Sequence, residues 1–404
     1  MSSDFGIKKS FHYSRIQEIT KLIEGYDGKI PFHRYLKDFF SKNKKFGSTD
    51  RKVISEWCFS FFRLGDALHE KDFLTRLTVG FFLVNGMKGE LIKELTGQFF
   101  KLQPESDALS LTERLNFIKT EFPEFESSQI FKFNSRLSGD LKVEEFSYSM
   151  LTAPKVWIRV NKNSRREVVA EECEDLNMKY EFDQVIPNAV SFPANSNLKQ
   201  LPSFVKGSIK IQDRSSQLAG SQVPAKANEH WWDCCCGAGG KSLQLLDAVP
   251  QIKITASDKR DSILQNFKER LSKNERSKVE LIQLDLESAS EIKFQKQAFD
   301  GILADVPCSG SGTWGRTPEM LTYFRENQVA VYAAKQQAII EKVIPYLKTG
   351  GYLVYITCSV FEAENEGIVN FLATFKELEL IKSALINGIS ERADTMFCAV
   401  FRKV

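Results

Sequence analysis

From about Gln212 onward the chain alternates short apolar, β-rich runs with helical stretches, and this alternation constrains its fold more than any other feature. The strand candidates are residues 230–234, 252–257, 279–284, 299–304, 352–356 and 396–401. The helix candidates lie between them at residues 241–248, 261–272, 323–347 and 364–375. Strand–helix–strand repetition builds a mostly parallel sheet with helices on both faces, so we expect an α/β domain over residues 211–404.

Residues 1–150 instead show the spacing of helices. Apolar residues recur at helical intervals over residues 13–23, 32–40 and 50–64, and Gly65 ends the third run. Phenylalanine is dense in these runs, which fits aromatic packing between helices. The sequence therefore predicts an all-helical N-terminal domain over residues 1–150.

A different composition begins near Leu151. A strand candidate starts at Lys155, a helix candidate spans residues 165–177, and a second strand candidate spans residues 189–193. We therefore expect a small α+β module over residues 151–210. Its first segment carries five basic residues between positions 155 and 166 and no acidic one. Such a segment suits a nucleic-acid backbone, and a charged strand edge that resists aggregation explains it equally well.

The first strand of the C-terminal region runs into a glycine-rich turn with the sequence Asp233-Cys-Cys-Cys-Gly-Ala-Gly-Gly-Lys-Ser242. Glycines at such a turn let a ligand approach the backbone and the N–H groups of the following helix. A phosphate-binding P-loop would need glycine at Cys235, so only the end of that motif fits. A nucleoside cofactor would need an acid at the end of the next strand, where Asp258 lies.

Acidic residues end three successive strand candidates: Asp258, Asp285 and Asp305. The carboxyl ends of parallel strands share one edge, so these carboxylates should line one crevice. They would repel a nucleoside triphosphate. Together with the glycine turn they favour a cofactor such as S-adenosylmethionine, and the alternative is a set of simple turn glycines and helix caps.

Two cysteines also lie where strand candidates end. Cys308 follows Asp305-Val-Pro, and Cys358 follows Thr357, so both thiols should reach the edge with the acids. The other cysteines fit buried apolar positions or the run 234–236. Adjacent cysteines converge poorly on one metal ion, so we expect no metal site in the run 234–236. His230 is the only histidine in this half of the sequence, which argues against a Cys-His hydrolase.

Composition excludes several classes of protein. The chain has 55 basic and 52 acidic residues, so any nucleic-acid-binding surface must be local. Residues 77–87 form the longest uncharged apolar stretch, which is too short to span a bilayer. Residues 1–9 lack the apolar core of a secretory signal. Eight cysteines without a Cys-x-x-Cys pair fit reduced thiols, so we expect a cytoplasmic protein.

Four segments occur in the same order as the motifs of a known family. They are Gln212-Asp-Arg-Ser-Ser-Gln217, the turn 233–242, residues 305–309 with Arg316-Thr-Pro-Glu319, and residues 355–359 with Glu364-Asn-Glu366. Over about residues 155–404 the chain resembles the RNA cytosine-5 methyltransferases of the Fmu/Sun (NOL/NOP/Sun) family. The helical residues 1–150 are most similar to the NusB-like extension of its bacterial ribosomal RNA branch.

This resemblance implies a Rossmann-like, S-adenosylmethionine-dependent methyltransferase domain and a role for each motif residue. Cys358 would be the nucleophile and Cys308 would help to resolve the covalent intermediate. Asp305 would hold the base, and Lys241 would lie at the catalytic edge. The residues expected to line the cofactor site are Cys236, Gly237, Ala238, Gly239, Gly240, Lys241, Asp258, Asp285 and Asp305. Those expected to contact RNA are Lys155, Arg159, Arg165, Arg166 and Arg316.

Two positions depart from the family pattern. Ala238 stands where the family usually has proline, and the family's paired arginines are reduced to Arg316, preceded by Gly315. The first change affects the glycine turn and the second affects RNA contacts, whereas both cysteines are retained.

The chemistry of cytosine explains why a methyltransferase acting at C5 needs a thiol. C5 is a poor nucleophile, but addition of a thiolate at C6 creates an enamine whose C5 can attack a methyl sulfonium. The base must also leave its stack, which suits single-stranded RNA. DNA cytosine-5 methyltransferases use the Pro-Cys cysteine as nucleophile, which would leave Cys358 unexplained.

The expected function is therefore RNA cytosine-5 methylation by a monomer, with ribosomal RNA as substrate and tRNA as the second choice. The alternatives are a catalytically silent RNA-binding assembly factor and a methyltransferase for proteins or small molecules.

Overall fold

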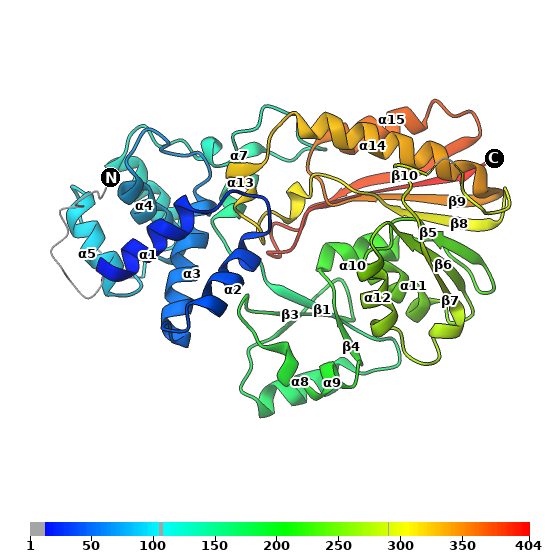
Figure 1. Ribbon diagram of the computed structural model, residues 1–404, viewed down its shortest axis with the longest axis horizontal. Helices are drawn as coiled ribbons and strands as arrows, with labels where there is room; N and C mark the ends of the chain where they lie inside the picture. Colours follow the sequence, from blue (N-terminus) through cyan, green and yellow to red (C-terminus); the bar gives the residue numbers. More distant parts are fainter. Residues whose placement is uncertain (1–12, 105–107, 290) are drawn as a thin grey trace. The chain divides into compact units, whose positions relative to one another are not determined.

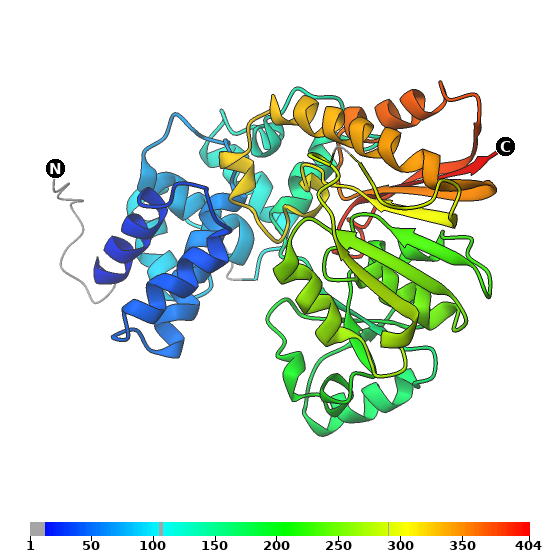
Figure 2. The ribbon, with the colours of Figure 1, turned by 45° about the vertical axis from the view of Figure 1, so that its right-hand side comes forward.

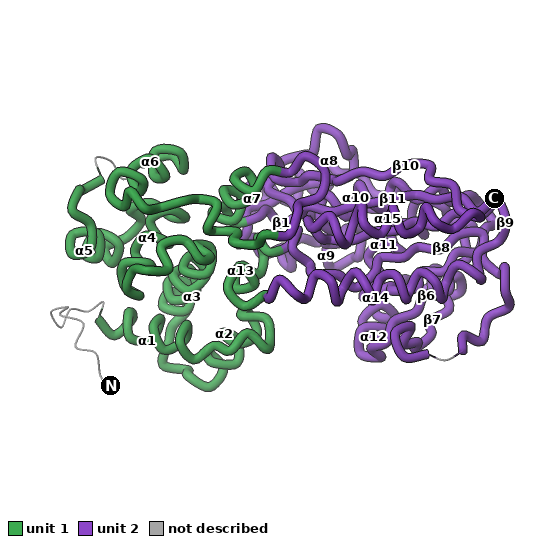
Figure 3. Tube along the Cα trace, turned by 90° about the horizontal axis from the view of Figure 1, so that it is seen from above, with its two compact units in different colours: residues 1–134, 142–153, 314–324 green, residues 135–141, 154–313, 325–404 purple. Residues whose placement is uncertain are grey.

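The computed structural model describes residues 13–104, 108–289 and 291–404 (Figure 1). Residues 1–9, where no secretory signal is expected, lie outside the described residues. Of the helices in the described ranges, none has the length and apolar character needed to cross a membrane. The chain divides into two compact units, which Figure 3 colours separately.

Unit 1 comprises residues 1–134, 142–153 and 314–324 and is helical. Its helices are α1 (Tyr13–Glu24), α2 (Phe32–Lys42), α3 (Ser48–Arg63), α4 (Phe73–Asn85), α5 (Glu90–Phe99), α6 (Leu111–Glu121), η1 (Ser127–Phe131), α7 (Val143–Met150) and α13 (Met320–Tyr323). The predicted helical N-terminal region is confirmed, and its three predicted helices correspond to α1, α2 and α3. Stacked rings join α3 to α4, where the centroids of Trp57 and Phe81 lie 3.9 Å apart.

A short segment from the C-terminal half of the sequence, residues 314–324, completes unit 1. The Trp314 ring packs against Phe133 and Phe324, with centroids 5.3 and 4.9 Å away. The buried carboxylate of Glu319 accepts a 2.9 Å hydrogen bond from the backbone N–H of Phe32, at the start of α2. Since these contacts are long-range, the local spacing of the sequence could not indicate them.

Unit 2 contains a seven-stranded sheet with the order β10-β11-β9-β8-β5-β6-β7. The strands are β5 (His230–Asp233), β6 (Lys253–Asp258), β7 (Val279–Gln283), β8 (Phe299–Asp305), β9 (Leu347–Thr357), β10 (Leu378–Ile386) and β11 (Met396–Lys403). Strands β5 to β9 pair in parallel, while β11 runs antiparallel to β9 and β10. The predicted α/β class with a mostly parallel sheet is confirmed.

Helices cover both faces of this sheet (Figures 1 and 2). They are α10 (Arg214–Ser221), α11 (Gly240–Ala248) and α12 (Asp261–Arg270) on one face, and α14 (Gln328–Val343) and α15 (Glu366–Leu372) on the other. Adjacent residues of β5 face opposite layers, because Trp231 packs in the cluster of Leu246 whereas Trp232 packs in that of Ile340. Strands buried on both faces read as continuous apolar runs, which is how they were recognisable in the sequence.

Several elements differ from the predicted ranges. The helix expected over residues 323–347 is α14 alone, because Phe324 is extended and Pro345 lies in the short helix η5 (Ile344–Tyr346). Strand β9 begins five residues earlier than expected, at Leu347. Strand β10 was not predicted, since it lies at the edge of the sheet with mostly exposed side chains and so lacks an apolar run.

A second, antiparallel sheet in unit 2 has the order β2-β3-β1-β4. It consists of β1 (Val156–Val160), β2 (Glu181–Phe182), β3 (Ala189–Phe192) and β4 (Ile209–Ile211), with α8 (Arg166–Asp175), η2 (Leu198–Gln200) and α9 (Pro202–Val205). One face packs on α8, where Ile158 and Phe192 contact the cluster that contains Val169. The domain boundaries expected at residues 150 and 210 stay predictions.

Candidate active site

The strand order of the large sheet reverses beside β5, which pairs with β6 on one side and β8 on the other. Ligands of open α/β sheets bind outside the carboxyl ends of the strands at such a point. A pocket of about 460 Å³ lies there. Its lining includes Cys235, Gly237, Asp258, Asp285, Asp305, Cys308 and Cys358. Folding thus gathers the glycine turn, the three acids and both strand-end cysteines around one cavity.

The glycine turn connects β5 to α11 with two left-handed residues. Gly237 and Gly239 have φ angles of +52° and +75°. A Cβ atom on Gly239 would lie 2.2 Å from the Phe267 ring, so only glycine fits that position. The carbonyl of Ala238 accepts a 2.6 Å hydrogen bond from Arg270. The turn is therefore ordered without the proline that the family usually carries at position 238.

Asp258 ends β6 and faces this turn. Its buried carboxylate accepts hydrogen bonds from the backbone N–H of Gly237 at 3.1 Å and from the guanidinium of Arg260 at 3.0 Å. Burial by itself raises the pKa of Asp258, but the hydrogen bonds from Arg260 and Gly237 outweigh it and hold the pKa below the usual value. The group therefore stays ionised and can accept hydrogen bonds from ribose hydroxyls.

Asp285 lies just beyond β7 and is half-buried. Its carboxylate accepts a 3.0 Å hydrogen bond from the backbone N–H of Glu287. A hydrogen bond from Ser288 lowers the pKa of Asp285. This acid also lines the pocket in its charged form.

Lys241, in the first turn of α11, forms an ion pair with Asp305 at the end of β8. The ammonium and the carboxylate oxygen are 2.6 Å apart, and Lys241 is only 8% exposed. Burial by itself lowers the pKa of Lys241, but the charge and hydrogen bond of Asp305 raise it above the usual value. Lys241 therefore stays charged and fixes the orientation of the Asp305 carboxylate in the pocket.

A fourth acid, Asp233, was not selected as a site residue from the sequence. It ends β5 and is buried, with one oxygen bound to the Ser242 hydroxyl at 2.6 Å. Its other oxygen has no hydrogen-bond partner. Burial raises the pKa of Asp233 to about 7. Its place at a strand end, like that of Asp258, is the signal that could have identified it.

The two strand-end cysteines lie side by side. The Sγ atoms of Cys308 and Cys358 are 3.4 Å apart, although the residues follow different strands. The hydrogen bond with Cys358, followed by burial, raises the pKa of Cys308 well above its usual value. Cys308 is therefore held as a neutral thiol. All eight cysteines of the chain are free.

The basic residues expected to contact RNA occupy different environments. Arg159 is buried and bonded to Asp247 and Gln212, so its guanidinium is not offered to a ligand. Lys155 pairs with Glu181 at 2.5 Å.

The remaining three residues expected to contact RNA are Arg165, Arg166 and Arg316. Arg165 has a 74% exposed side chain, and Arg166 donates to the carbonyl of Pro187 at 3.1 Å. Arg316 belongs to unit 1, whereas the other basic candidates belong to unit 2.

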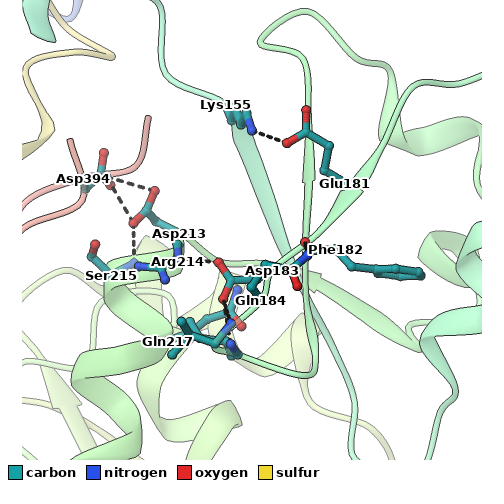
Figure 4. Close-up of polar contacts among 12 residues, drawn as sticks. Lys155, Glu181, Phe182, Asp183, Gln184, Asp213, Arg214, Ser215, Gln217 and Asp394 are labelled. Atoms are coloured by element: carbon teal, nitrogen blue, oxygen red, sulfur yellow. Dashed lines mark hydrogen bonds and ion pairs between the residues drawn. The ribbon is translucent and has the colours of Figure 1, made fainter. Parts of the chain in front are cut away.

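The segment 212–217 joins the small sheet to the seven-stranded sheet within unit 2 (Figure 4). Asp213 caps α10 by accepting a 2.8 Å hydrogen bond from the backbone N–H of Ser215. Arg214 forms a buried ion pair with Asp183. Gln217 donates to the carbonyl of Ile158 in β1 at 3.1 Å. These contacts explain the segment as a structural joint.

Among the described residues, no group of three or more histidine, cysteine or acidic side chains is arranged to hold a metal ion.

Comparison with known proteins identifies the domain around this pocket. Residues 222–398 match the family model of the 16S rRNA methyltransferase RsmB/F. These residues belong to the RsmB/F methyltransferase family. The predicted relationship to Fmu/Sun methyltransferases is thereby confirmed, and with it the expected cofactor, S-adenosylmethionine.

Similar proteins include two bacterial members named ribosomal RNA small subunit methyltransferase B. The protein of Serratia proteamaculans (strain 568) is 33% identical over 232 residues, which are 57% of this chain and 54% of that protein. The protein of Proteus mirabilis (strain HI4320) is 31% identical over 236 residues, with 56% and 54% coverage. The chain thus matches about half the length of these relatives.

Solved structures show the same fold. The crystal structure of PH0851 superposes with a TM-score of 0.70 at 19% identity, covering 98% of this chain and all of that one. The structure of NSun6 from Pyrococcus horikoshii with SFG gives a TM-score of 0.57 at 19% identity, covering 66% of this chain and 96% of that one. The Rossmann-like methyltransferase fold of the RsmB/F domain is therefore established.

Proposed function

We propose that this protein is an S-adenosylmethionine-dependent RNA cytosine-5 methyltransferase that acts on ribosomal RNA. The observation that carries the proposal is the pair of thiols 3.4 Å apart, in the same pocket as Asp305, the partner of Lys241. A methyltransferase for ordinary nucleophiles needs no cysteine pair, whereas C5 of cytosine needs covalent activation. The ribosomal RNA substrate is proposed from the names of the relatives.

The residues present fit the cofactor. Gly237 and Gly239 leave the turn without side chains, and nothing lies within 4 Å of a Cβ position at Gly237, so a ligand can approach the backbone there. Asp258 would bind the ribose hydroxyls and Asp285 would lie toward the base of the nucleoside. When bound, S-adenosylmethionine supplies an electrophilic methyl group.

The thiolate of Cys358 would add to C6 of a cytosine, which makes C5 nucleophilic toward that methyl group. Asp305, oriented by Lys241, would accept a hydrogen bond from the base. Formation of the sulfur–C6 bond would remove negative charge beside Cys308. This thiol could then give its own proton to solvent and, as a thiolate, take the C5 proton. Loss of that proton breaks the sulfur–C6 bond and releases 5-methylcytosine.

The test uses three variants, bulk ribosomal RNA, bulk tRNA and a labelled methyl donor. Cys358→Ala should give neither 5-methylcytosine nor a covalent protein–RNA complex. Cys308→Ala should accumulate a covalent complex that denaturing gels resolve. Cys173→Ala, which alters a buried cysteine of α8, should behave like the wild type.

If wild-type protein transfers label to no cytosine of either RNA, the proposal is wrong. Label in tRNA alone would show that the substrate is tRNA and not ribosomal RNA. Binding of RNA without transfer would identify a silent assembly factor.

A further inference from the structure

A buried carboxylate joins the loops that carry the two cysteines. Glu364, which is fully buried at the end of η6 (Glu362–Glu364), accepts a 2.8 Å hydrogen bond on Oε2 from the backbone N–H of Ser309. Its Oε1 accepts a 2.8 Å hydrogen bond from the hydroxyl of Ser359. Ser309 follows Cys308 and Ser359 follows Cys358, so one carboxylate contacts the residue after each thiol.

The sheet itself does not hold these two loops together. The β8–β9 ladder ends where Asp305 pairs with Ile356, two or three residues before the cysteines. Beyond that point the loops are linked by Glu364 and by the hydroxyls of Ser309 and Ser359, which are 3.1 Å apart. Two further bonds join them: the backbone N–H of Gly312 donates to the Cys358 carbonyl at 2.9 Å, and that of Val360 donates to the Ser311 hydroxyl at 2.9 Å. The carboxylate is the charged member of this link, and charge-assisted hydrogen bonds are the stronger ones.

A neighbouring side chain locks Glu364 in place. The amide of Gln336, on α14, donates to Glu364 Oε2 at 3.0 Å and to the carbonyl of Pro307 at 3.0 Å. The hydroxyl oxygen of Tyr355 lies 3.0 Å from Gln336 Oε1 and 2.6 Å from the Glu364 carbonyl oxygen, so its one proton is shared between these two acceptors. Each Glu364 oxygen therefore has a fixed donor, and the group cannot rotate without leaving one unpaired.

The other two members of the Glu-Asn-Glu segment do different work. The Asn365 amide donates to the Ser359 carbonyl at 2.9 Å, so it supports only the Cys358 loop. The Glu366 carboxylate accepts hydrogen bonds from the hydroxyl of Ser138 at 2.7 Å and from the backbone N–H of Gly139 at 2.9 Å. Among the three, Glu364 is the one that bridges both cysteine loops.

We propose that Glu364 is a positioning residue that sets the separation of the Cys308 and Cys358 thiols, so that Cys308 can act on the adduct formed by Cys358. The role of the pair in methylation rests on the proposed function. The positioning itself does not, because the distance between two thiols can be probed without RNA or cofactor.

The probe is the equilibrium of the two thiols with glutathione. Cys308 and Cys358 lose two electrons and two protons to form a disulfide, while one oxidised glutathione is reduced to two glutathione thiols. The equilibrium constant reports the effective concentration of one thiol at the other. Thiol alkylation followed by mass spectrometry of the peptides measures it.

Glu364→Gln keeps the size of the side chain but replaces one acceptor oxygen by an amide NH2 group. In either orientation of the amide, this NH2 group faces another hydrogen-bond donor. We expect the effective concentration to fall about tenfold, since a charged buried hydrogen bond is lost. Glu366→Gln, two residues away, changes the same chemistry outside the cysteine loops and should match the wild type. An unchanged constant in folded Glu364→Gln would overturn the proposal.

If near-ultraviolet circular dichroism shows that Glu364→Gln is not folded, two further variants decide the test. Ser359→Ala removes the Oε1 contact and the hydroxyl link to Ser309 but leaves the Oε2 contact of Glu364, and should lower the constant in the same direction. Glu364→Asp keeps the charge but is too short to reach both loops, and should also lower it. Wild-type constants in both folded variants would contradict the proposed role.

Methylation provides the second readout. Under the proposed function, Glu364→Gln should lower kcat about tenfold and leave the Kd of S-adenosylmethionine unchanged, because the carboxylate does not line the cofactor turn. A wild-type protein that methylates no RNA would reject the proposed function only, whereas the glutathione measurement would still decide the role of Glu364.

Discussion

Replacing Arg214 by methionine should expose how much the joint between the two sheets of unit 2 contributes to stability. The guanidinium of Arg214 and the carboxylate of Asp183 are 10% and 2% exposed and form a direct ion pair (Figure 4). Arg214→Met keeps most of the apolar stem and removes the charge. Asp183 would then remain buried without its cationic partner.

The expected loss follows from the contacts that remain. Removing one partner of a buried ion pair costs about 3–5 kcal/mol. Asp183 would keep hydrogen bonds from the backbone N–H groups of Val185 at 2.8 Å and Ile186 at 2.6 Å. We therefore expect the lower end, about 3 kcal/mol of unfolding free energy at pH 7.

The loss should depend on pH with a definite sign. Burial by itself raises the pKa of Asp183, but the bonds from Arg214 and the backbone hold it below the usual value. In the wild type this pairing stabilises the fold above the unfolded pKa of about 4 and is lost as pH falls through the folded pKa. In Arg214→Met the carboxyl can be neutralised by protonation, so the difference between the proteins should shrink at low pH.

Urea unfolding followed by tryptophan fluorescence at pH 7 and pH 4 measures the effect. Arg165→Met removes an exposed arginine from the same small sheet region and should change stability by less than about 0.5 kcal/mol. The double variant Asp183→Asn with Arg214→Met should recover much of the loss, because no charge is then buried. A loss below about 1 kcal/mol at pH 7, or one that grows on acidification, would refute the reasoning.

Three further predictions concern the pocket and the glycine turn beside it. Burial raises the pKa of Asp233 to about 7, so the folded state retains a proton that the unfolded state releases above about pH 4. The unfolding free energy of the wild type in urea, relative to that of Asp233→Asn, should therefore fall as the pH rises from 4 to 7. A difference that does not change with pH contradicts this. Gly239→Ala, whose Cβ would meet Phe267 at 2.2 Å, should weaken calorimetric binding of S-adenosylmethionine at least about tenfold; unchanged affinity contradicts it. Asp258→Asn should weaken that binding while Arg260→Gln changes it less, and the reverse order would show that Arg260 holds the ligand.

Much of the fold was predictable because its signals are local. The apolar runs of β5, β6 and β8 and the helical spacing of α1 to α3 are visible within a few residues of sequence. The strand-end position of Asp258, Asp305, Cys308 and Cys358 also follows from the strand pattern alone. Parallel strands must bring such residues to one edge, and the pocket contains them.

Other features could not be predicted because they depend on contacts far apart in sequence. The edge strand β10 lacks an apolar run, and residues 314–324 join unit 1 through the ring of Trp314. The basic segment after position 155 read as one surface, yet folding buries Arg159 against Asp247 and leaves Arg165 exposed. The sequence shows which side chains are charged, but it does not show which of them are buried against a partner of opposite charge.

The amino-acid sequence by itself determined the class of fold, the edge where ligands bind and the residue types available there, because periodicity and strand ends are local properties. Only the tertiary structure decided that Cys308 and Cys358 lie 3.4 Å apart and that Glu364 bonds to both of their loops. Distances between side chains are set by the packing of strands and helices that are remote in sequence, so no local pattern encodes them.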